Sequence, residues 1–214
     1  MHDALRPSQL REHFGDIDIY LFDQLLRGRI DERATVLDAG CGSGRNLVFL
    51  VRAGMRVYGV DAGADAIAAA QRRLSEAAPE FNAPQLSVQS VDALGFANDA
   101  MDVVISSAVL HFARDDEHFE AMVREMWRVL APGGLLFARL ASTIGIEGRV
   151  RPLQGRHHEL PDGSTRYLVD EALLMETTRR LGGSLLDPLK TTVVQGMRAM
   201  TTWVVRKEDR RIGG

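Results

Sequence analysis

Short apolar runs and longer amphipathic stretches alternate along the chain from residue 35 onward. Runs typical of strands buried on both faces lie at Thr35–Ala39, Arg56–Asp61, 86–91, 102–107 and 135–140. Apolar residues at three- and four-residue spacings, typical of helices, occupy 45–53, Ala64–Ala77 and 115–130. Strands that alternate with helices of these lengths predict an α/β fold with a doubly wound, mostly parallel sheet.

A further helix is predicted before the first strand. One helical face is formed by Ile17, Tyr20, Leu21, Gln24 and Leu25. Gly28 follows this face and supplies a stop signal. We expect residues 1–34 to form a helical cap on the domain.

The chain after residue 140 combines an irregular part and a regular part. Residues 141–168 show no clear period and contain four glycines and two prolines, so we expect a long excursion there. Asp170 can cap a helix that continues to residue 181. Two later runs, 191–195 and 199–205, predict an antiparallel hairpin.

Composition excludes several classes of protein. The 214 residues are 45% hydrophobic and 26% charged, which is typical of a globular domain. No uncharged apolar run approaches the roughly 18 residues of a membrane-spanning helix, and the N-terminus lacks a signal-peptide core, so a cytoplasmic location without membrane contact is the default expectation. A net charge of −3 offers no broad positive surface, so we expect no nucleic-acid partner.

A glycine-rich loop joins the first predicted strand to the helix after it. The loop reads Asp38-Ala39-Gly40-Cys41-Gly42-Ser43-Gly44, and it lies where an open parallel sheet exposes backbone N–H groups to ligands. The dinucleotide fingerprint would place its third glycine at position 45, where this chain has arginine, so the motif argues against NAD. A carboxylate at Asp38 would repel a diphosphate and attract an ammonium group.

Two more aspartates follow predicted strands at the same edge of the sheet. Asp61 comes 17 residues after Gly44, close to the spacing at which an acidic residue binds ribose hydroxyls. Asp92 follows the third strand and could accept a hydrogen bond from a purine amine. Either aspartate alone could simply cap a turn, but with the glycine loop the two predict a nucleoside site. Cys41 is the single cysteine, and a small filler in the loop is its simplest role.

These motifs resemble the class I S-adenosylmethionine-dependent methyltransferases over residues 35–140. The resemblance is carried, in order, by 36–44, 57–61, 91–92, 102–106 and 128–134. A finer resemblance, to methyltransferases of the tellurite-resistance type, is carried by 42–46 and 200–207.

The resemblance implies a Rossmann-like sheet of seven strands with one antiparallel strand, S-adenosyl-L-methionine as the cofactor, and a single methyltransferase domain. Its parts would be 1–34 as the cap, 35–140 as the cofactor-binding core, 141–168 as a substrate-side excursion and 169–214 as the helix and hairpin. The loop would hold the methionine end, Asp61 the ribose and Asp92 the adenine, with Val91 or Ala93 packed on it. The candidate cofactor residues are Asp38, Gly40, Cys41, Gly42, Gly44, Asn46, Asp61, Ala62, Val91, Asp92, Ala93 and Ser106.

Methyl transfer from a sulfonium depends mainly on positioning and desolvation, so a base is optional. His111, just beyond the fourth strand, is the best-placed candidate base, with an apparent pKa near that of histidine and a loss of about 10²- to 10⁴-fold when it is removed. A loop histidine that lines the adenosyl pocket or caps the next helix is the alternative. His157 and His158 are adjacent, so their side chains diverge, and we predict no metal site.

The acceptor is predicted to be small and anionic, either an organic molecule or a metalloid oxyanion. The sequence lacks the Asp/Asn-Pro-Pro-aromatic signature of enzymes that methylate adenine or glutamine. Two alternatives remain open. One is methylation of a protein or RNA, and the other is a catalytically silent domain that binds the cofactor as a sensor or as a subunit of a complex.

The N-terminal helix and the excursion are predicted to roof the acceptor pocket, because the loop after the fifth strand leaves the sheet at its ligand-binding edge. Arg149, Arg151 and Arg156 belong to a local surplus of arginine that could clamp an anion. Tyr20 would meet the roof from the first helix. A solvated loop with paired arginines, and core packing for Tyr20, explain the same residues without a ligand.

Overall fold

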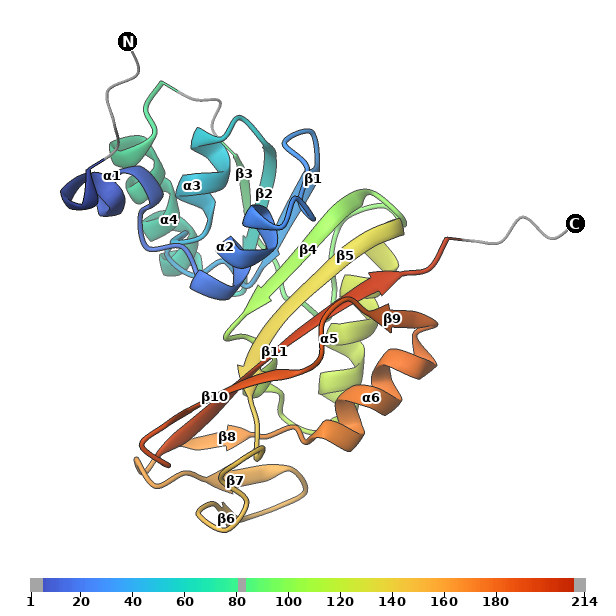
Figure 1. The fold of residues 1–214 in the computed structure, drawn as a ribbon. Coiled ribbons are helices and arrows are strands. Elements are labelled where there is room, and N and C mark those ends of the chain that lie inside the picture. The colour runs from blue at the N-terminus through green and yellow to red at the C-terminus, as the bar shows by residue number, and fades with distance from the viewer. Residues whose placement is uncertain (1–5, 81–83, 210–214) are drawn as a thin grey trace, which may run out of the picture.

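The computed structural model describes residues 6–80 and 84–209, and a central sheet in it carries helices on both faces (Figure 1). The strand order is β10-β11-β5-β4-β1-β2-β3, and β9 pairs with the last residues of β11. These strands are β1 (Thr35–Ala39), β2 (Arg56–Asp61), β3 (Gln85–Val88), β4 (Met101–Ser107), β5 (Leu130–Ala141), β9 (Gly183–Leu185), β10 (Lys190–Val194) and β11 (Arg198–Lys207).

The sheet is mostly parallel, as predicted. The pairs from β3 through β2, β1 and β4 to β5 are all parallel, and β11 runs antiparallel to β5, β9 and β10. The predicted C-terminal hairpin is therefore present. The expected number of seven strands is wrong for the described residues, because the short β9 adds an eighth beside β11.

Alternating strand residues bury two separate cores. Val36 and its neighbours on one face pack against α2 (Ile19–Leu26), α3 (Leu47–Arg52) and α4 (Ala64–Ala77). Leu37 and its neighbours on the other face pack against α5 (Asp116–Val129) and α6 (Glu171–Arg180). This arrangement is the doubly wound one, with residues buried on both faces of each central strand.

Most helix boundaries follow the signals in the sequence. The side chain of Asp115 accepts a hydrogen bond from the backbone N–H of His118 at the start of α5, and Asp170 caps α6 in the same way. The N-terminal region has a short 3₁₀ turn (Pro7–Gln9) and α1 (Leu10–Phe14) before α2. The predicted helix of the cap corresponds to α2.

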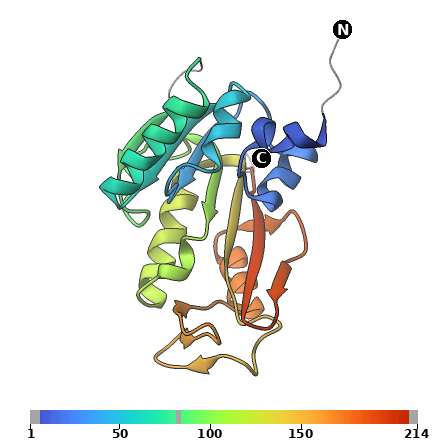
Figure 2. The same ribbon diagram turned by 90° about the vertical axis from the view of Figure 1, so that its left-hand side faces the viewer.

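The excursion contains regular structure that its sequence did not predict. Residues 151–167 form a small antiparallel sheet of β6 (Arg151–Pro152), β7 (His157–Glu159) and β8 (Thr165–Tyr167). Strands of two or three residues are too short for a hydrophobic period to show. The small sheet lies beside the C-terminal end of β5 and the turn of the β10–β11 hairpin (Figures 1 and 2).

The carboxyl ends of the parallel strands meet at one edge, and that edge positions the candidate site. The glycine loop leaves β1 there, Asp61 ends β2, and Ser107 ends β4. The third strand is shorter than predicted, because the ladder stops at Val88. Ser90 and Val91 are therefore free to turn toward the loops of the neighbouring strands.

Candidate active site

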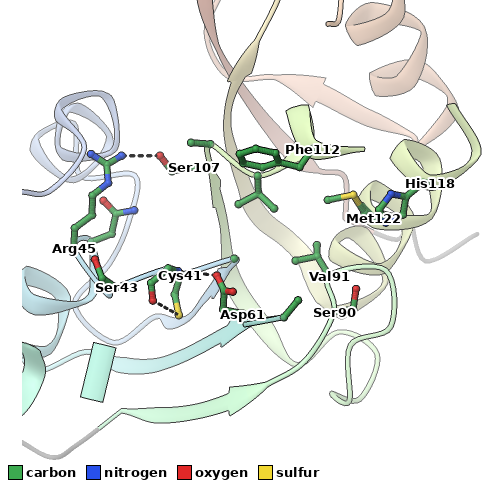
Figure 3. A pocket seen from close by; sticks show the side chains of 16 residues that line it. Cys41, Ser43, Arg45, Asp61, Ser90, Val91, Ser107, Phe112, His118 and Met122 are labelled. Carbon is green, nitrogen blue, oxygen red and sulfur yellow. Dashed lines mark hydrogen bonds between the residues drawn. The ribbon is translucent and has the colours of Figure 1, made fainter. Parts of the chain in front are cut away.

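A cavity of about 540 Å³ opens at the carboxyl edge of the sheet. Its lining comes from the ends of four parallel strands, the segments that follow them, and helix α5: Gly40, Cys41, Gly42, Ser43, Arg45, Asn46, Asp61, Ala62, Ser90, Val91, Ser107, Ala108, Val109, Phe112, His118 and Met122. Figure 3 shows Arg45 at one end, His118 and Met122 at the other, and Asp61 between them. We call this space the first cavity.

The glycine loop has a backbone that only glycine accepts without strain. Gly40 has φ of +86°, and a Cβ there would lie 2.3 Å from Cγ2 of Val109. Gly44 has φ of +77° and lies against Ala70 of α4, so it allows close packing of the loop on that helix. The N–H groups of Gly40 and Cys41 both donate to the carbonyl of Val60, each over 2.8 Å. The loop is thereby fixed to the end of β2.

Asp61 is held by backbone groups on both sides. Its carboxylate accepts hydrogen bonds from the N–H of Gly42 at 3.0 Å and from the N–H of Gly63 at 2.9 Å. These bonds connect the glycine loop to the start of α4 and orient the carboxylate at the wall of the first cavity. A carboxylate retains further lone pairs for hydroxyl groups of a ligand.

Asp38 is a buried carboxylate that lacks partners. It is 1% exposed, and neither carboxylate oxygen has a hydrogen-bond partner among the described residues. Burial raises the pKa of Asp38 to about 7, although Asn46 and Arg45 act in the opposite direction. A buried group of this kind is expected to gain from a cationic partner. Burial also raises the pKa of Cys41 to about 12, so its thiol is protonated and is no nucleophile.

The far end of the first cavity combines apolar and polar side chains. Val91, Phe112 and Met122 supply apolar contacts there. Asp92 accepts a hydrogen bond from the hydroxyl of Ser90, and its other oxygen is 3.3 Å from Nε2 of His118. The Ser90 hydroxyl lowers the pKa of Asp92 from its usual value. Asp92 thus orients two residues that line the cavity.

Seven of the twelve predicted cofactor residues line the first cavity: Gly40, Cys41, Gly42, Asn46, Asp61, Ala62 and Val91. The remaining five, Asp38, Gly44, Asp92, Ala93 and Ser106, are not among its lining residues. Ser106 is fully buried in β4, whereas the next residue, Ser107, lines the cavity. Successive residues of a strand face opposite sides of the sheet. The sequence therefore identified the correct end of β4, but Ser107 and not the predicted Ser106 lines the cavity.

Asp18 is a functional candidate that the sequence analysis missed. It caps α2 and is 3% exposed, and its carboxylate binds Arg45 at 3.0 Å, Arg139 at 3.4 Å and the Ser107 hydroxyl at 3.1 Å. Asp18 also binds Asn46, since its backbone N–H donates to Oδ1 of Asn46. The sequence offered one signal, an aspartate near the start of a predicted helix. That signal predicts a helix cap but does not predict the contacts with the two arginines and the serine.

A second cavity, of about 380 Å³, lies beyond this cluster. It shares two lining residues, Arg45 and Ala108, with the first cavity. Its full lining is Arg45, Ala108, His111, Arg139, Ala141, Leu160, Asp162, Ser164, Arg166, Thr192, Val194, Arg198 and Met200. Ala108 has φ of +64°, a conformation that is strained for alanine, at the wall between the two spaces.

His111 lies in the second cavity and is 8% exposed. Its Nδ1 accepts a hydrogen bond from the backbone N–H of Ala141 at 3.3 Å. Burial, with a smaller contribution from Arg166, lowers the pKa of His111 to about 4. The side chain is therefore neutral near pH 7, and its proton is on Nε2.

The three arginines predicted for the acceptor site lie outside the lining of both cavities. Arg151 pairs with Glu159 across the small sheet, and Arg156 binds Asp170 at 2.8 Å. Arg149 packs against Gly196 in the β10–β11 turn. The excursion does contribute to the second cavity, but through Leu160, Asp162, Ser164 and Arg166.

Tyr20 meets the C-terminal hairpin and not the excursion. Its hydroxyl bonds to the Thr192 hydroxyl, and Thr192 lines the second cavity. The guanidinium of Arg139 lies 5.2 Å from the centre of the Tyr20 ring. Tyr20 therefore contacts two residues of the lining, Thr192 and Arg139, without lining the cavity itself.

Neither a metal cluster nor a membrane span is found in the described part of the chain. No group of three or more His, Cys, Asp or Glu side chains there could hold a metal ion. No helix within residues 6–80 and 84–209 is long and apolar enough to cross a bilayer.

Comparison with known families agrees with this geometry. Residues 36–134, which span the glycine loop, Asp61 and the first residues of β5, match the family model described as a methyltransferase domain. The match covers just under half of the chain, and this part of the chain is similar to methyltransferase domains. The methyltransferase family resemblance of the sequence is thus confirmed, and the tellurite-resistance type is not tested by these matches.

Curated relatives are 27–32% identical over the aligned residues. Trans-aconitate 2-methyltransferase of Azoarcus sp. is 32% identical over 117 residues, 53% of this chain and 42% of the relative. Ubiquinone biosynthesis O-methyltransferase of Bradyrhizobium sp. is 27% identical, over 65% and 58% respectively. A probable S-adenosylmethionine-dependent methyltransferase of Mycobacterium tuberculosis is 29% identical, over 85% and 70%. The chain spans about half the length of the first two relatives.

Solved structures share the fold across nearly the whole chain. A Pyrococcus horikoshii protein has a TM-score of 0.73 at 18% identity, over 96% of this chain and all of its own. Magnesium protoporphyrin IX methyltransferase from Synechocystis has a TM-score of 0.69 at 22% identity, over 97% and 90%. These likenesses confirm the predicted Rossmann-like architecture.

Proposed function

We propose that this methyltransferase domain transfers the methyl group of S-adenosyl-L-methionine to a small, anionic molecule. The observation that carries the proposal is the position of Asp61, which is fixed by two backbone N–H groups at the wall of the first cavity. A carboxylate fixed in this way suits the two hydroxyls of a ribose. The magnesium protoporphyrin enzyme whose fold matches was solved with S-adenosylhomocysteine bound.

The residues of the first cavity fit the parts of this cofactor. Asp38 lies outside the lining, at the end of β1 just before the loop that lines the cavity, and its unpartnered, buried carboxylate suits the ammonium of the methionine end. Gly40 and Gly42 let that end approach the main chain. Val91, Phe112 and Met122 offer apolar surface for the adenine. When bound, the cofactor supplies a sulfonium whose methyl group is open to in-line attack. The chain's contribution is to orient the two reactants and exclude water.

The second cavity is the proposed acceptor site. It adjoins the first at Arg45 and Ala108, so a molecule held there would lie beside the cofactor. Four arginines line it against one aspartate, which favours an anion. Ala141, Leu160 and Val194 also line it, and such apolar walls favour an organic acceptor over a bare metalloid oxyanion. Two relatives are named for trans-aconitate and for ubiquinone biosynthesis.

Calorimetric titration of the full chain with S-adenosyl-L-methionine tests the cofactor site. Asp61→Ala should weaken binding by about ten- to a hundredfold, because charge-assisted hydrogen bonds contribute about 1.5–3 kcal/mol. Asp65→Ala removes the same charge from an exposed position in the first turn of α4 and should leave the affinity within about twofold. Unchanged binding by Asp61→Ala would reject the ribose assignment, and equal affinity for NAD would reject the cofactor.

The activity is tested by transfer of labelled methyl groups into separated small-molecule, protein and RNA fractions. We expect label in the small-molecule fraction, in compounds retained by an anion-exchange column. Label in protein or RNA alone would replace the proposal with methylation of a macromolecule. Cofactor binding without any transfer would favour a sensor or a subunit of a complex.

A further inference from the structure

We propose that the second cavity recognises a carboxylate of an organic acceptor through the Nε2–H of a neutral His111 acting together with the guanidinium of Arg166. This inference rests on the proposed function, because it specifies how the acceptor site of that function would work. It also changes the role of His111 from the base expected from the sequence to a hydrogen-bond donor.

The backbone fixes the form of the imidazole. The N–H of Ala141 points its hydrogen at Nδ1 of His111, so Nδ1 must present a lone pair. A neutral ring with a lone pair on Nδ1 carries its hydrogen on Nε2. A protonated ring would instead place two donors, its own Nδ1–H and the N–H of Ala141, against each other. The ring can thus donate from Nε2 but has no nitrogen available to take a proton from an acceptor.

Arg166 places a cation beside this donor. It comes from β8, lines the same cavity as His111, and its guanidinium lies 5.2 Å from the centre of the Phe112 ring, next to His111 in the chain. Within the described part of the chain, its guanidinium donates a single hydrogen bond, to the carbonyl of Thr165, so donors remain for a ligand. A guanidinium and a neutral N–H donor on one wall suit the two oxygens of a carboxylate.

The charges around the second cavity are not balanced by the protein. Arg45 and Arg139 share the carboxylate of Asp18, and Arg166 and Arg198 have Asp162 beside them in the lining. Four guanidiniums therefore face two carboxylates among the described residues. A surplus of this kind at a concave surface raises the local concentration of anions.

The remaining lining argues that the anion has a carbon skeleton. Ala108, Leu160 and Met200 present apolar surface, and the volume of about 380 Å³ falls within the range of roughly 300–1,000 Å³ that is typical of small-molecule pockets. An inorganic oxyanion would be too small and too polar to contact most of this apolar surface. A carboxylate at His111 and Arg166, with an organic body against the apolar wall, satisfies both parts.

The experiment is calorimetric titration of the full chain, saturated with S-adenosylhomocysteine, with four probes: benzoate, succinate, trans-aconitate and inorganic sulfate. At least one carboxylate should bind, and more tightly than sulfate. His111→Leu and Arg166→Met should each weaken that binding by at least tenfold. His111→Asn, which keeps an N–H donor, should stay within about threefold of the native chain. Arg151→Met, which removes an arginine outside both cavities, is the matched control and should match the native affinity.

The pH dependence separates a neutral donor from an imidazolium. His111 is the one histidine among the described residues that line the second cavity, and the charged groups there are Arg45, Arg139, Asp162, Arg166 and Arg198. With the first cavity saturated, the carboxylate affinity should stay within about twofold between pH 6 and 8. Recognition by a protonated ring would instead weaken by tenfold or more as the pH rises through the ordinary histidine range.

Failure of this inference can be told apart from failure of the proposed function. Affinity for S-adenosylhomocysteine reports on the first cavity and should be the same in all four variants. Absence of binding by every carboxylate, sulfate bound as tightly as the carboxylates, or full affinity in both His111→Leu and Arg166→Met would each overturn the inference. Arg166 is only partly buried, so its variant tests the site even where His111→Leu destabilises the fold.

Discussion

The two cavities share a wall but are built in different ways. The first takes most of its shape from backbone, since short runs of residues at the ends of four neighbouring strands line it, together with two side chains of α5. The second is lined by residues from 45 to 200, drawn from the glycine loop, β5, the excursion and the C-terminal hairpin. Backbone fixes the position of a ligand, whereas long side chains contribute charge and adapt their shape. We therefore expect the first cavity to be rigid and the second, as the proposed acceptor site, to be more adaptable.

The charges of the two cavities are also opposite. The carboxylate of Asp61 lines the first, with that of Asp38 buried at the end of β1, whereas four guanidiniums line the second. Asp18 lies between them and pairs with Arg45, which belongs to both linings. This pair, in which only Asp18 is buried, separates a region suited to a cationic sulfonium ligand from one suited to an anion.

The largest expected effect tests the backbone origin of the first cavity. Gly40→Ala places a Cβ against Val109 and also keeps a positive φ, so it should cost about 2–5 kcal/mol in the free energy of unfolding. Gly42 has φ of +54°, and a Cβ there would meet open space. Gly42→Ala should therefore lower the free energy of unfolding by only about 1–2 kcal/mol. Chemical denaturation of both variants measures the difference. Equal losses would show that Val109 moves aside and that the loop is less rigid than described.

A smaller effect tests the pairing of Asp38 with the cofactor ammonium. The pKa of Asp38 is raised to about 7, so its charge is lost as the pH falls below that value. Affinity for S-adenosyl-L-methionine should therefore fall by up to tenfold per pH unit from pH 7 to pH 5.5 and be level above pH 8. Asp38→Asn should bind more weakly and lose this pH dependence. A native profile that is flat from pH 5.5 to 8 would contradict the pairing.

The same shift has a consequence for the stability of the ligand-free protein. The folded state binds the Asp38 proton more tightly than the unfolded chain does, because the folded pKa lies above the unfolded value. The contribution of this residue is therefore fully present at low pH and is lost as the pH rises through about 7. The difference in unfolding free energy between the native chain and Asp38→Asn, measured from pH 5 to 8, should follow this trend.

The smallest expected effect concerns the arginines that the sequence favoured. Replacing Arg149, Arg151 and Arg156 together with glutamine should leave carboxylate affinity at the second cavity within about twofold, because none of them lines it. The matched triple, Arg139, Arg166 and Arg198, should lower that affinity by at least tenfold. Calorimetry with the same carboxylate probe compares them. A loss confined to the first triple would restore the sequence-based assignment.

Regular elements of the fold were predictable where one segment carries its own signal. The bounds of β1, β2 and α4 agree with the predicted ranges, since each has a complete apolar period and a glycine or polar residue at its end. The short β9 has no such signal. It is a strand only because β11 offers it an edge, and that edge comes from about twenty residues later in the chain.

The candidate site also contains residues that the sequence could predict and residues that it could not. Gly40, Gly42 and Asp61 were predictable because a strand, a tight loop and a helix follow one another within 25 residues. The Asp18 cluster was not, since its partners Arg45 and Arg139 are 27 and 121 residues away. The arginines that line the second cavity were indistinguishable in sequence from those that pair on the surface. Only the tertiary positions of the carboxylates separate the two groups.

The hydrogen bond between Tyr20 and Thr192 has a consequence for the order in which the parts of the chain fold during synthesis. It joins residues 172 positions apart, across nearly the whole chain. The core strands β1, β2 and β4 can associate once residue 107 has been synthesised, so the methyl-donor half can fold while the rest is still being made. The second cavity has to wait for the hairpin that closes it, and closing so long a loop is slow. Nascent chains would thus bind the donor before they could select an acceptor.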